Sequence, residues 1–438
     1  MIETLMLISM IAYIAIASIM ILGYFKSLID TRKYIRLAKS RSRPKLSKQV
    51  SLLILIPVLR EQNVITETIK YFEQLDMENI VLHLCIAGTK REYISLENYG
   101  FKKSTKQVVE ETCQNMKTTS GFTVDFFEAE DYDGGDRATQ LNHATKCALE
   151  KYADIDVIGV YDADSRPTPD TLIEVAEKYL INEKASYQQP AFFLDAANKM
   201  TQNGENPILI ANALYQNAWS VISEIPMWID YTKSKGRGKG NFYCIGHGEF
   251  FPKKIYEAYK FPEHTVTDGI QIGYRLSMSG QQVEILNNYC SDDVPHQLTT
   301  LIKQHKRWFG GCMRLMESYN WCKDNCREHK FSTVLSGYWS QFQWAFAANL
   351  FWLNFLLSVA YVYIGGTAMP MILLLSIGII YCYILPVIST CLTPIESHVS
   401  KLAFLALPLA IFIKGIGPNL YIWNCLLYRE NKYEKVER

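Results

Sequence analysis

The sequence has 438 residues, of which 49% are hydrophobic and 20% charged, a mixture that suits a part-soluble, part-membrane protein better than a wholly soluble one. The formal net charge of +1 gives no overall reason to expect a nucleic-acid partner. The 11 cysteines include no CxxC pair and no His/Cys cluster at zinc spacing, so we expect reduced thiols, as in a cytoplasmic domain.

The first apolar run, at 5–25, carries no charge and is long enough to cross a bilayer as a helix. A cleaved signal peptide is disfavoured, because basic residues follow the run instead of preceding it. Lys and Arg dominate 26–48, where Asp30 is the one acid. By the positive-inside rule we expect a transmembrane helix at 1–27, an outward N-terminus and a basic cytoplasmic linker at 28–50 that can contact anionic lipid.

Three more apolar runs could each span a membrane, at 346–364, 369–391 and 402–427. The segment 331–345 mixes Trp and Tyr with Gln, which is typical of an interfacial helix. Proline and glycine interrupt the last run, so a kinked or re-entrant segment is expected and the side of the C-terminus stays open. We therefore predict interfacial helices at 298–345, a membrane bundle at 346–428 and a charged tail at 429–438, in an integral protein of the plasma (inner) membrane.

The intervening segment, 51–297, reads as an α/β domain. Short apolar runs typical of buried parallel strands alternate with segments of helical spacing. The strands are expected at 51–57, 80–86, 122–127 and 156–161, and helices at 61–75 and 137–152. This alternation predicts an open, mostly parallel mixed sheet, in which ligands bind beyond the carboxyl ends of the strands.

Two carboxylates, Asp162 and Asp164, directly follow the strand at 156–161. In an extended segment residues i and i+2 point the same way, so both can reach one site. A divalent cation held against a diphosphate would relieve their repulsion, and carboxylate oxygens suit Mg²⁺ or Mn²⁺. The alternative is a loop with two solvated or helix-capping aspartates.

Other candidate residues each have a structural alternative. Asp268 opens a helical pattern, as an N-cap or as a general base for an acceptor hydroxyl. Gln304, Arg307 and Trp308 share one helix face, which suits a diphosphate beside a sugar ring but also a basic interfacial helix. Arg137 opens a helix after a strand, where it can compensate phosphate charge or lie exposed.

Together these motifs resemble the inverting family 2 glycosyltransferases, in the membrane branch that contains cellulose, chitin and hyaluronan synthases. The resemblance covers about 51–314 by motif order and the flanking membrane segments by layout. It rests on Pro57 followed by Arg60 and Glu61, on 135–142 with Arg137 where Lys is usual, on Asp162-Ala163-Asp164, on Gln189-Pro190, on 246–250, and on Gln304-x-x-Arg307-Trp308.

The resemblance implies a GT-A nucleotide-sugar domain and a single displacement with inversion at the anomeric carbon. It implies nucleotide-sugar contacts by Pro57, Glu61, Thr89, Arg137, Asp162 and Asp164, with UDP as the favoured nucleotide. It implies acceptor contacts by Gln189, Gly248, Glu249 and Trp308. Asp164 and Asp162 would hold Mg²⁺ or Mn²⁺, and Asp268, Gln304, Arg307 and Trp308 would be catalytic.

Two segments depart from the family pattern. The triplet Thr267-Asp268-Gly269 has glycine where the base is usual, so Asp268 serves instead, Asp292 or Asp293 contributes, or the motif is shifted by one residue. The second strand ends at Thr89 without its usual acidic segment, so Thr89 and backbone groups are expected to meet the nucleotide base.

The sequence thus predicts a hexosyl- or N-acetylhexosaminyltransferase of the cell envelope or capsule, acting at the cytoplasmic membrane face on a growing glycan or lipid-linked acceptor. Processive polysaccharide synthesis with export is the first expectation. Transfer of one sugar to a lipid or lipid-linked acceptor is the alternative. A non-catalytic membrane scaffold is a remote third, supported only by the glycine at 269.

Overall fold

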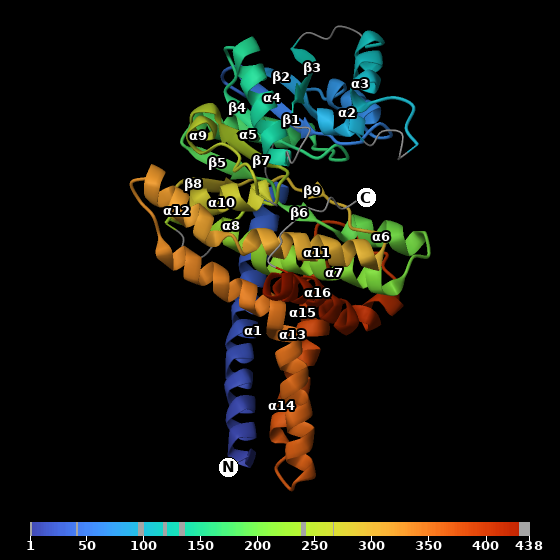
Figure 1. Cartoon of the computed structure of the whole chain (residues 1–438), viewed down its shortest axis with the longest axis vertical. Helices are drawn as coiled ribbons and strands as arrows, with labels where there is room; N and C mark the ends of the chain where they lie inside the picture. Colours follow the sequence, from blue (N-terminus) through green and yellow to red (C-terminus); the bar gives the residue numbers. More distant parts are fainter. Residues whose placement is uncertain are drawn as a thin grey trace.

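The computed structural model describes residues 2–40, 43–94, 100–116, 121–130, 136–237, 242–265 and 267–428. The predicted charged tail at 429–438 and Gly135, at the start of one family motif, lie outside these residues. Figure 1 shows the sheet domain at one end of the molecule and the apolar helices at the other.

The sheet domain contains a seven-stranded sheet in the order β3-β2-β1-β4-β7-β5-β8. Its strands are β1 (Val50–Pro57), β2 (Ile80–Thr89), β3 (Phe122–Ala129), β4 (Val157–Val160), β5 (Ala185–Gln188), β7 (Glu249–Pro252) and β8 (Gln282–Ile285). β7 is antiparallel to both of its neighbours, β4 and β5, and the other pairs are parallel. The predicted mostly parallel mixed sheet is confirmed. A second, two-stranded sheet joins β6 (Ala191–Phe192) to β9 (Cys290–Ser291).

Helices cover both faces of the large sheet, which explains the unbroken apolar run in β1. Leu52 and Ile54 pack on the face covered by α2 (Ile65–Glu73), α3 (Thr105–Gln114) and α5 (Pro169–Ile181). Leu53 and Leu55 pack on the opposite face, with α4 (Arg137–Lys151) and α8 (Ile225–Ser234). Successive strand residues alternate between faces, so each face of β1 needs its own apolar set.

The remaining helices lie between the large sheet and the apolar end of the molecule or border the sheet (Figure 1). They are α6 (Leu194–Gln202), α7 (Pro207–Trp219) with its continuation η3 (Ser220–Glu224), α9 (Lys253–Tyr259), α10 (Asp268–Ser279), α11 (Leu298–Cys312) and α12 (Leu315–Asn325). α10 begins after the loop that follows α9, α11 begins after the segment that follows β9, and both helices contribute to the cavity described below.

Four helical segments among the described residues are long and apolar enough to cross a membrane: 3–40, 331–363, 369–392 and 401–427. They correspond to α1 (Ile2–Ser40), α13 (Phe331–Tyr363), the succession α14 (Met369–Ile379), η4 (Ile380–Ile384) and α15 (Leu385–Leu392), and α16 (Lys401–Tyr428). In Figure 1 the N-terminus lies at the end of α1 farthest from the sheet. α16 lies across the direction of α1 and α14, packed against α7 and α11.

Three of the apolar helices, α1, α13 and α16, are each continuous beyond the boundary or the break that the sequence predicts. α1 runs past the predicted membrane end at 27, because Leu28 and Ile35 pack into the sheet domain and the Thr31 hydroxyl donates to the Val221 carbonyl oxygen at 2.7 Å. α13 likewise unites the predicted interfacial segment 331–345 with the span after it. α16 is continuous although it contains two prolines. The C-terminal part of α1 therefore packs directly against the sheet domain.

Candidate functional site

A cavity of about 1070 Å³ lies between the carboxyl ends of β1 and β4, the starts of α4 and α10, and the apolar helices. Pro57 and Glu61 line it after β1, and Asp162 and Asp164 line it after β4. The side away from the large sheet is lined by parts of α1, α13, α14 and α16. One continuous space therefore joins the predicted donor residues to helices that are long enough to cross a bilayer.

Arg137 links two of the predicted acidic residues. Its Nη1 lies 2.6 Å from Asp268 Oδ2 and its Nη2 lies 3.3 Å from Asp162 Oδ1. The second nitrogen also donates to the carbonyl oxygen of Gly246. Burial alone would lower the pKa of Arg137, but the charges of Asp268, Asp162 and Glu249 raise it. A planar guanidinium can meet both carboxylates at once, which the usual lysine could not do with the same geometry.

The donor atoms of Asp162 and Asp164 fit a hard divalent cation. Asp162 is partly buried and Asp164 is exposed at the end of β4, and both line the cavity. Carboxylate oxygens that are open to a cavity suit Mg²⁺ or Mn²⁺, which retain water and substrate oxygens as further ligands. The arrangement therefore supports the predicted metal position.

Position 269 has no room for an aspartate. A Cβ at Gly269 would lie 2.6 Å from both the Cα and the N of Gly246, closer than real Cβ contacts. The glycine is thus needed for close approach of α10 to the loop before β7. Because Arg137 contacts Asp268 and Asp162 together, Asp268 is the acid of this triplet that lies beside the donor motif.

The other two candidate bases also line the cavity but have different partners. Asp292 Oδ2 lies 2.7 Å from His247 Nε2, an ion pair outside hydrogen-bond geometry. Burial lowers the pKa of His247, but the charge of Asp292 outweighs this and raises the pKa well above its usual value. The Asp293 carboxylate accepts from the Val294 N–H at 2.9 Å. Asp292 therefore faces His247, and its charge favours the protonated form of that imidazole.

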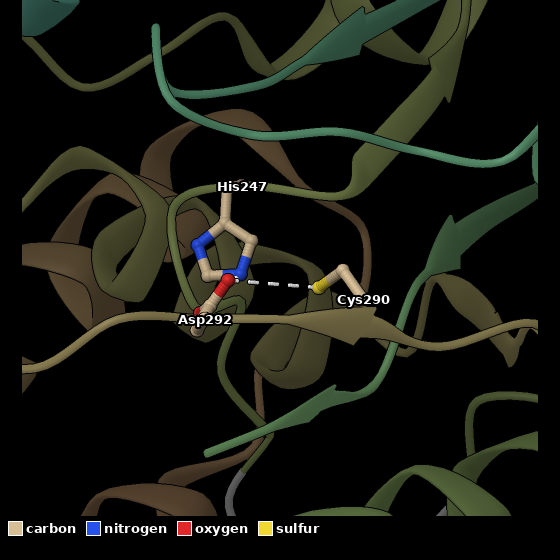
Figure 2. Close-up of side chains that lie close together, drawn as sticks. All are labelled: His247, Cys290 and Asp292. Atoms are coloured by element: carbon tan, nitrogen blue, oxygen red, sulfur yellow. Dashed lines mark hydrogen bonds and ion pairs between the residues drawn. The ribbon is translucent and has the colours of Figure 1, made fainter. Parts of the chain in front are cut away.

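Figure 2 shows His247 with Asp292 and Cys290, whose ligand atoms all lie within 4.8 Å of one another. Nitrogen, sulfur and carboxylate donors together suit a transition metal such as Zn²⁺ better than Mg²⁺. Burial raises the pKa of the Cys290 thiol to about 11, so it stays protonated without a metal. Sequence spacing could not reveal this group, because the loop before β7 and strand β9 come together only in the fold.

On α11, the predicted face is brought to the cavity: Gln304, Arg307 and Trp308 all line it. His305 is buried against Trp344, with ring centroids 6.1 Å apart. Burial lowers the pKa of His305 to about 3, so the imidazole is neutral. The amphipathic α11 therefore turns a neutral side chain inward and its polar motif toward the cavity.

Four predicted contact residues do not line this cavity. Thr89 is buried at the end of β2, and Gly248 donates its N–H to the Val160 carbonyl oxygen at 2.8 Å. Gln189 is buried and accepts from the Tyr161 hydroxyl at 2.6 Å. Glu249 is buried, and neither of its oxygens meets an N–H or O–H donor among the described residues. Burial, assisted by the charge of Asp268, raises the pKa of Glu249 to about 8.

The comparisons with known proteins decide the class. The family model described as "Glycosyl transferase family group 2" matches residues 157–390, just over half of the chain. The chain belongs to this family. It is thus a glycosyltransferase that uses a nucleotide-sugar donor, and its sheet has the GT-A arrangement. A comparison with curated proteins found no match.

Among solved structures, the glycosyltransferase is similar to the mannosyltransferase PcManGT from Pyrobaculum calidifontis in complex with GDP-Man and Mn²⁺. The TM-score is 0.51 at 12% identity, over 94% of this chain and 99% of that one. S. aureus TarS 1-349 in complex with UDP-GlcNAc matches with a TM-score of 0.41 at 12% identity, over 87% of this chain and 92% of that one. At such identities the first likeness shows the fold, and the second carries no argument.

Proposed function

We propose that this glycosyltransferase moves a hexosyl or N-acetylhexosaminyl group, with inversion, from a nucleoside diphosphate sugar to a lipid or lipid-linked acceptor. The reaction would take place at the cytoplasmic face of the plasma (inner) membrane. The observation that carries this proposal is the shared cavity, because Asp162 and Asp164 line the same space as α1, α13 and α16. An acceptor held by the membrane can thus reach the donor without leaving the bilayer.

The proposed roles follow from position. Pro57 and Glu61 meet the nucleotide beyond β1, and Asp162 and Asp164 hold Mg²⁺ or Mn²⁺. When bound, the metal supplies positive charge to the leaving nucleoside diphosphate. Resemblance favours UDP as that nucleotide.

The acceptor side is assigned to α10 and α11. Asp268 takes the proton of the acceptor hydroxyl while Arg137 fixes the orientation of its carboxylate. Arg307 stabilises the developing charge of the leaving group, and Gln304 and Trp308 support the acceptor sugar. Gln189 and Gly248 then act behind the cavity wall, because the Gln189 N–H donates to the Gly248 carbonyl oxygen and so holds the loop before β7, and Glu249 is buried next to them.

Processive polysaccharide synthesis with export, as in the cellulose, chitin and hyaluronan synthase branch, is the second candidate. Gln304, Arg307 and Trp308 favour it, because they resemble the terminal motif of that branch and line a cavity that continues among apolar helices. The mostly apolar side chains of the cavity's membrane half favour a lipid chain over a hydrated glycan, so we place single transfer first.

Incubation of the purified chain with labelled UDP- and GDP-sugars and Mn²⁺ tests both single transfer and processive synthesis. Reactions with and without membrane lipid extract are compared, with Asp164→Asn as the inactive control. One discrete lipid-soluble product that needs the extract supports the proposal. A ladder of polymer would favour processive synthesis. Release of no nucleotide from any donor, with or without extract, would refute both.

A further inference from the structure

Lys414 places its amino group in the wall of the cavity, on α16, inside an otherwise apolar helical segment. Its ammonium lies 4.4 Å from the ring centroid of Tyr215, 4.6 Å from that of Trp219 and 5.6 Å from that of Trp344. A lysine within an apolar segment is costly, and such residues commonly mark a functional position. The bland alternative is a lysine that only fills space among aromatic rings.

Among the residues that the structure describes, no carboxylate oxygen lies within 4.0 Å of the Lys414 ammonium. Glu224 faces the same cavity but accepts its hydrogen bond from the Tyr243 hydroxyl, at 2.9 Å. Burial raises the pKa of Glu224 to about 7, although the hydrogen bond from Tyr243 and the charge of Lys414 both oppose this rise, so near neutral pH this carboxyl is only partly ionised. Aromatic faces attract a cation but offset only part of its desolvation. The charge of Lys414 is therefore incompletely compensated by the protein.

The position of this charge is fixed below the acceptor side of the site. A Cβ at Gly417 would lie 2.6 Å from the Lys306 backbone nitrogen, so glycine lets α16 touch α11. Trp344 Nε1 donates to the Lys414 carbonyl oxygen at 3.3 Å, which fixes α16 against α13. α11 also carries Arg307 and Trp308 into the cavity. Lys414 is thus held at the level where the catalytic end of the cavity meets its membrane half.

Beyond Lys414 the cavity wall is mainly apolar. Six of its members from the membrane-side helices are Ile16, Met20, Phe351, Trp352, Ile377 and Phe412. An occupant that satisfies both parts needs an anionic group next to an apolar chain. A neutral lipid would displace water from the ammonium without offering it a negative charge. A neutral glycan would leave the apolar walls of the cavity in contact with water.

We infer that Lys414 binds the phosphate of the acceptor, and that the acceptor is a sugar joined to an apolar chain through a phosphate or diphosphate. The chain lies along α1, α13 and α16, the phosphate meets Lys414, and the sugar reaches Trp308 and Asp268. This inference rests on the proposed function and narrows it, because it excludes diacylglycerol and other uncharged acceptors.

Binding of farnesyl phosphate to the full chain in detergent, followed by calorimetry without any donor, tests the inference. We expect Lys414→Gln to weaken this binding at least about tenfold and Lys414→Arg to retain most of it, as expected for loss and conservation of a charge-assisted contact. Lys401→Gln is the matched control, because Lys401 is an exposed lysine of the same helix. Thermal unfolding of each variant shows whether it is folded.

Three outcomes would overturn the inference. Farnesol could bind as tightly as farnesyl phosphate, Lys414→Gln could bind like the wild type, or inorganic phosphate alone could compete fully at the same concentration. The last result would mark an anion site without a lipid. Binding of UDP and GDP with Mn²⁺ to the wild-type chain is measured separately. If the wild-type chain bound neither nucleotide, this would count against the proposed function. The effect of Lys414→Gln on farnesyl phosphate binding would still test the inference separately.

Discussion

The close contact of Gly269 with Gly246 gives a sharp test of the base assignment. A Cβ at Gly269 would lie 2.6 Å from backbone atoms of Gly246, and real Cβ contacts essentially never fall under 3.0 Å. In Gly269→Ala the start of α10 must therefore move by at least about 0.4 Å, because backbone cannot swing away as a side chain can. Overpacking of this kind costs about 1–3 kcal/mol.

The same shift would displace Asp268, whose carboxylate lies 2.6 Å from Arg137 Nη1. Since misplacement of about 1 Å can cost about 100-fold in rate, we expect kcat to fall by at least about tenfold in Gly269→Ala. Gly269→Asp, which restores the usual family residue, should be no more active than Gly269→Ala. Initial transfer rates and thermal unfolding in detergent measure the two effects.

The matched control is Gly23→Ala in α1, where a Cβ would meet nothing within 4 Å. Alanine is the better helix former by about 1 kcal/mol, so this variant should be as stable as the wild type or slightly more stable. Wild-type activity and stability in Gly269→Ala would refute the packing argument. Higher activity in Gly269→Asp than in the wild type would refute Asp268 as the base.

Three further variants test other parts of the site. Asp164→Asn should abolish sugar transfer without changing the unfolding temperature, and unchanged turnover would refute the role of Asp164 at the metal. In the wild type, a chelator should stop transfer and added Mn²⁺ should restore it. Arg137→Lys should lower kcat at least about tenfold, because an ammonium cannot fork to Asp162 and Asp268, and an unaltered rate would show that bridging is dispensable. Burial raises the pKa of Glu249 to about 8. The folded chain therefore keeps a proton that the unfolded chain releases above about pH 4.5. As a result, the free energy of unfolding falls as the pH rises from about 4.5 to about 8. Glu249→Gln should remove most of this pH dependence, so its free energy of unfolding should rise relative to that of the wild type by on the order of 4 kcal/mol between these pH values. The same pH dependence in both proteins would contradict the burial argument.

Local pattern was sufficient for much of the sheet domain. The apolar run of β1 and the carboxylates after β4 could be read from the sequence, because the strand period and the strand end fix where side chains point. The shared face of Gln304, Arg307 and Trp308 followed from helical spacing in the same way, and all three line the cavity. These are properties of neighbours in the chain, so no knowledge of distant contacts was needed.

The burial of Glu249 and Gln189 could not be read from local pattern. Glu249 and Gln189 match a family motif, and their types suggest acceptor contacts. The structure buries both side chains: Glu249 is the first residue of β7, which pairs antiparallel with β4 and β5, and Gln189 follows β5 and accepts from the Tyr161 hydroxyl. The reason for glycine at 269 was equally hidden, since it depends on a backbone 23 residues earlier in the chain.

The sequence by itself determined the alternation of strands and helices, the order of the motifs and the four apolar segments. Hydropathy and the periodic spacing of apolar residues are properties of consecutive residues, so they can be read without the fold. The tertiary structure alone decided that α16 lies across the other apolar helices and presents Lys414 to the donor cavity. It also brought His247, Cys290 and Asp292 together. Hydropathy measures how readily a segment leaves water, but its direction and neighbours depend on packing between residues that are distant in the chain.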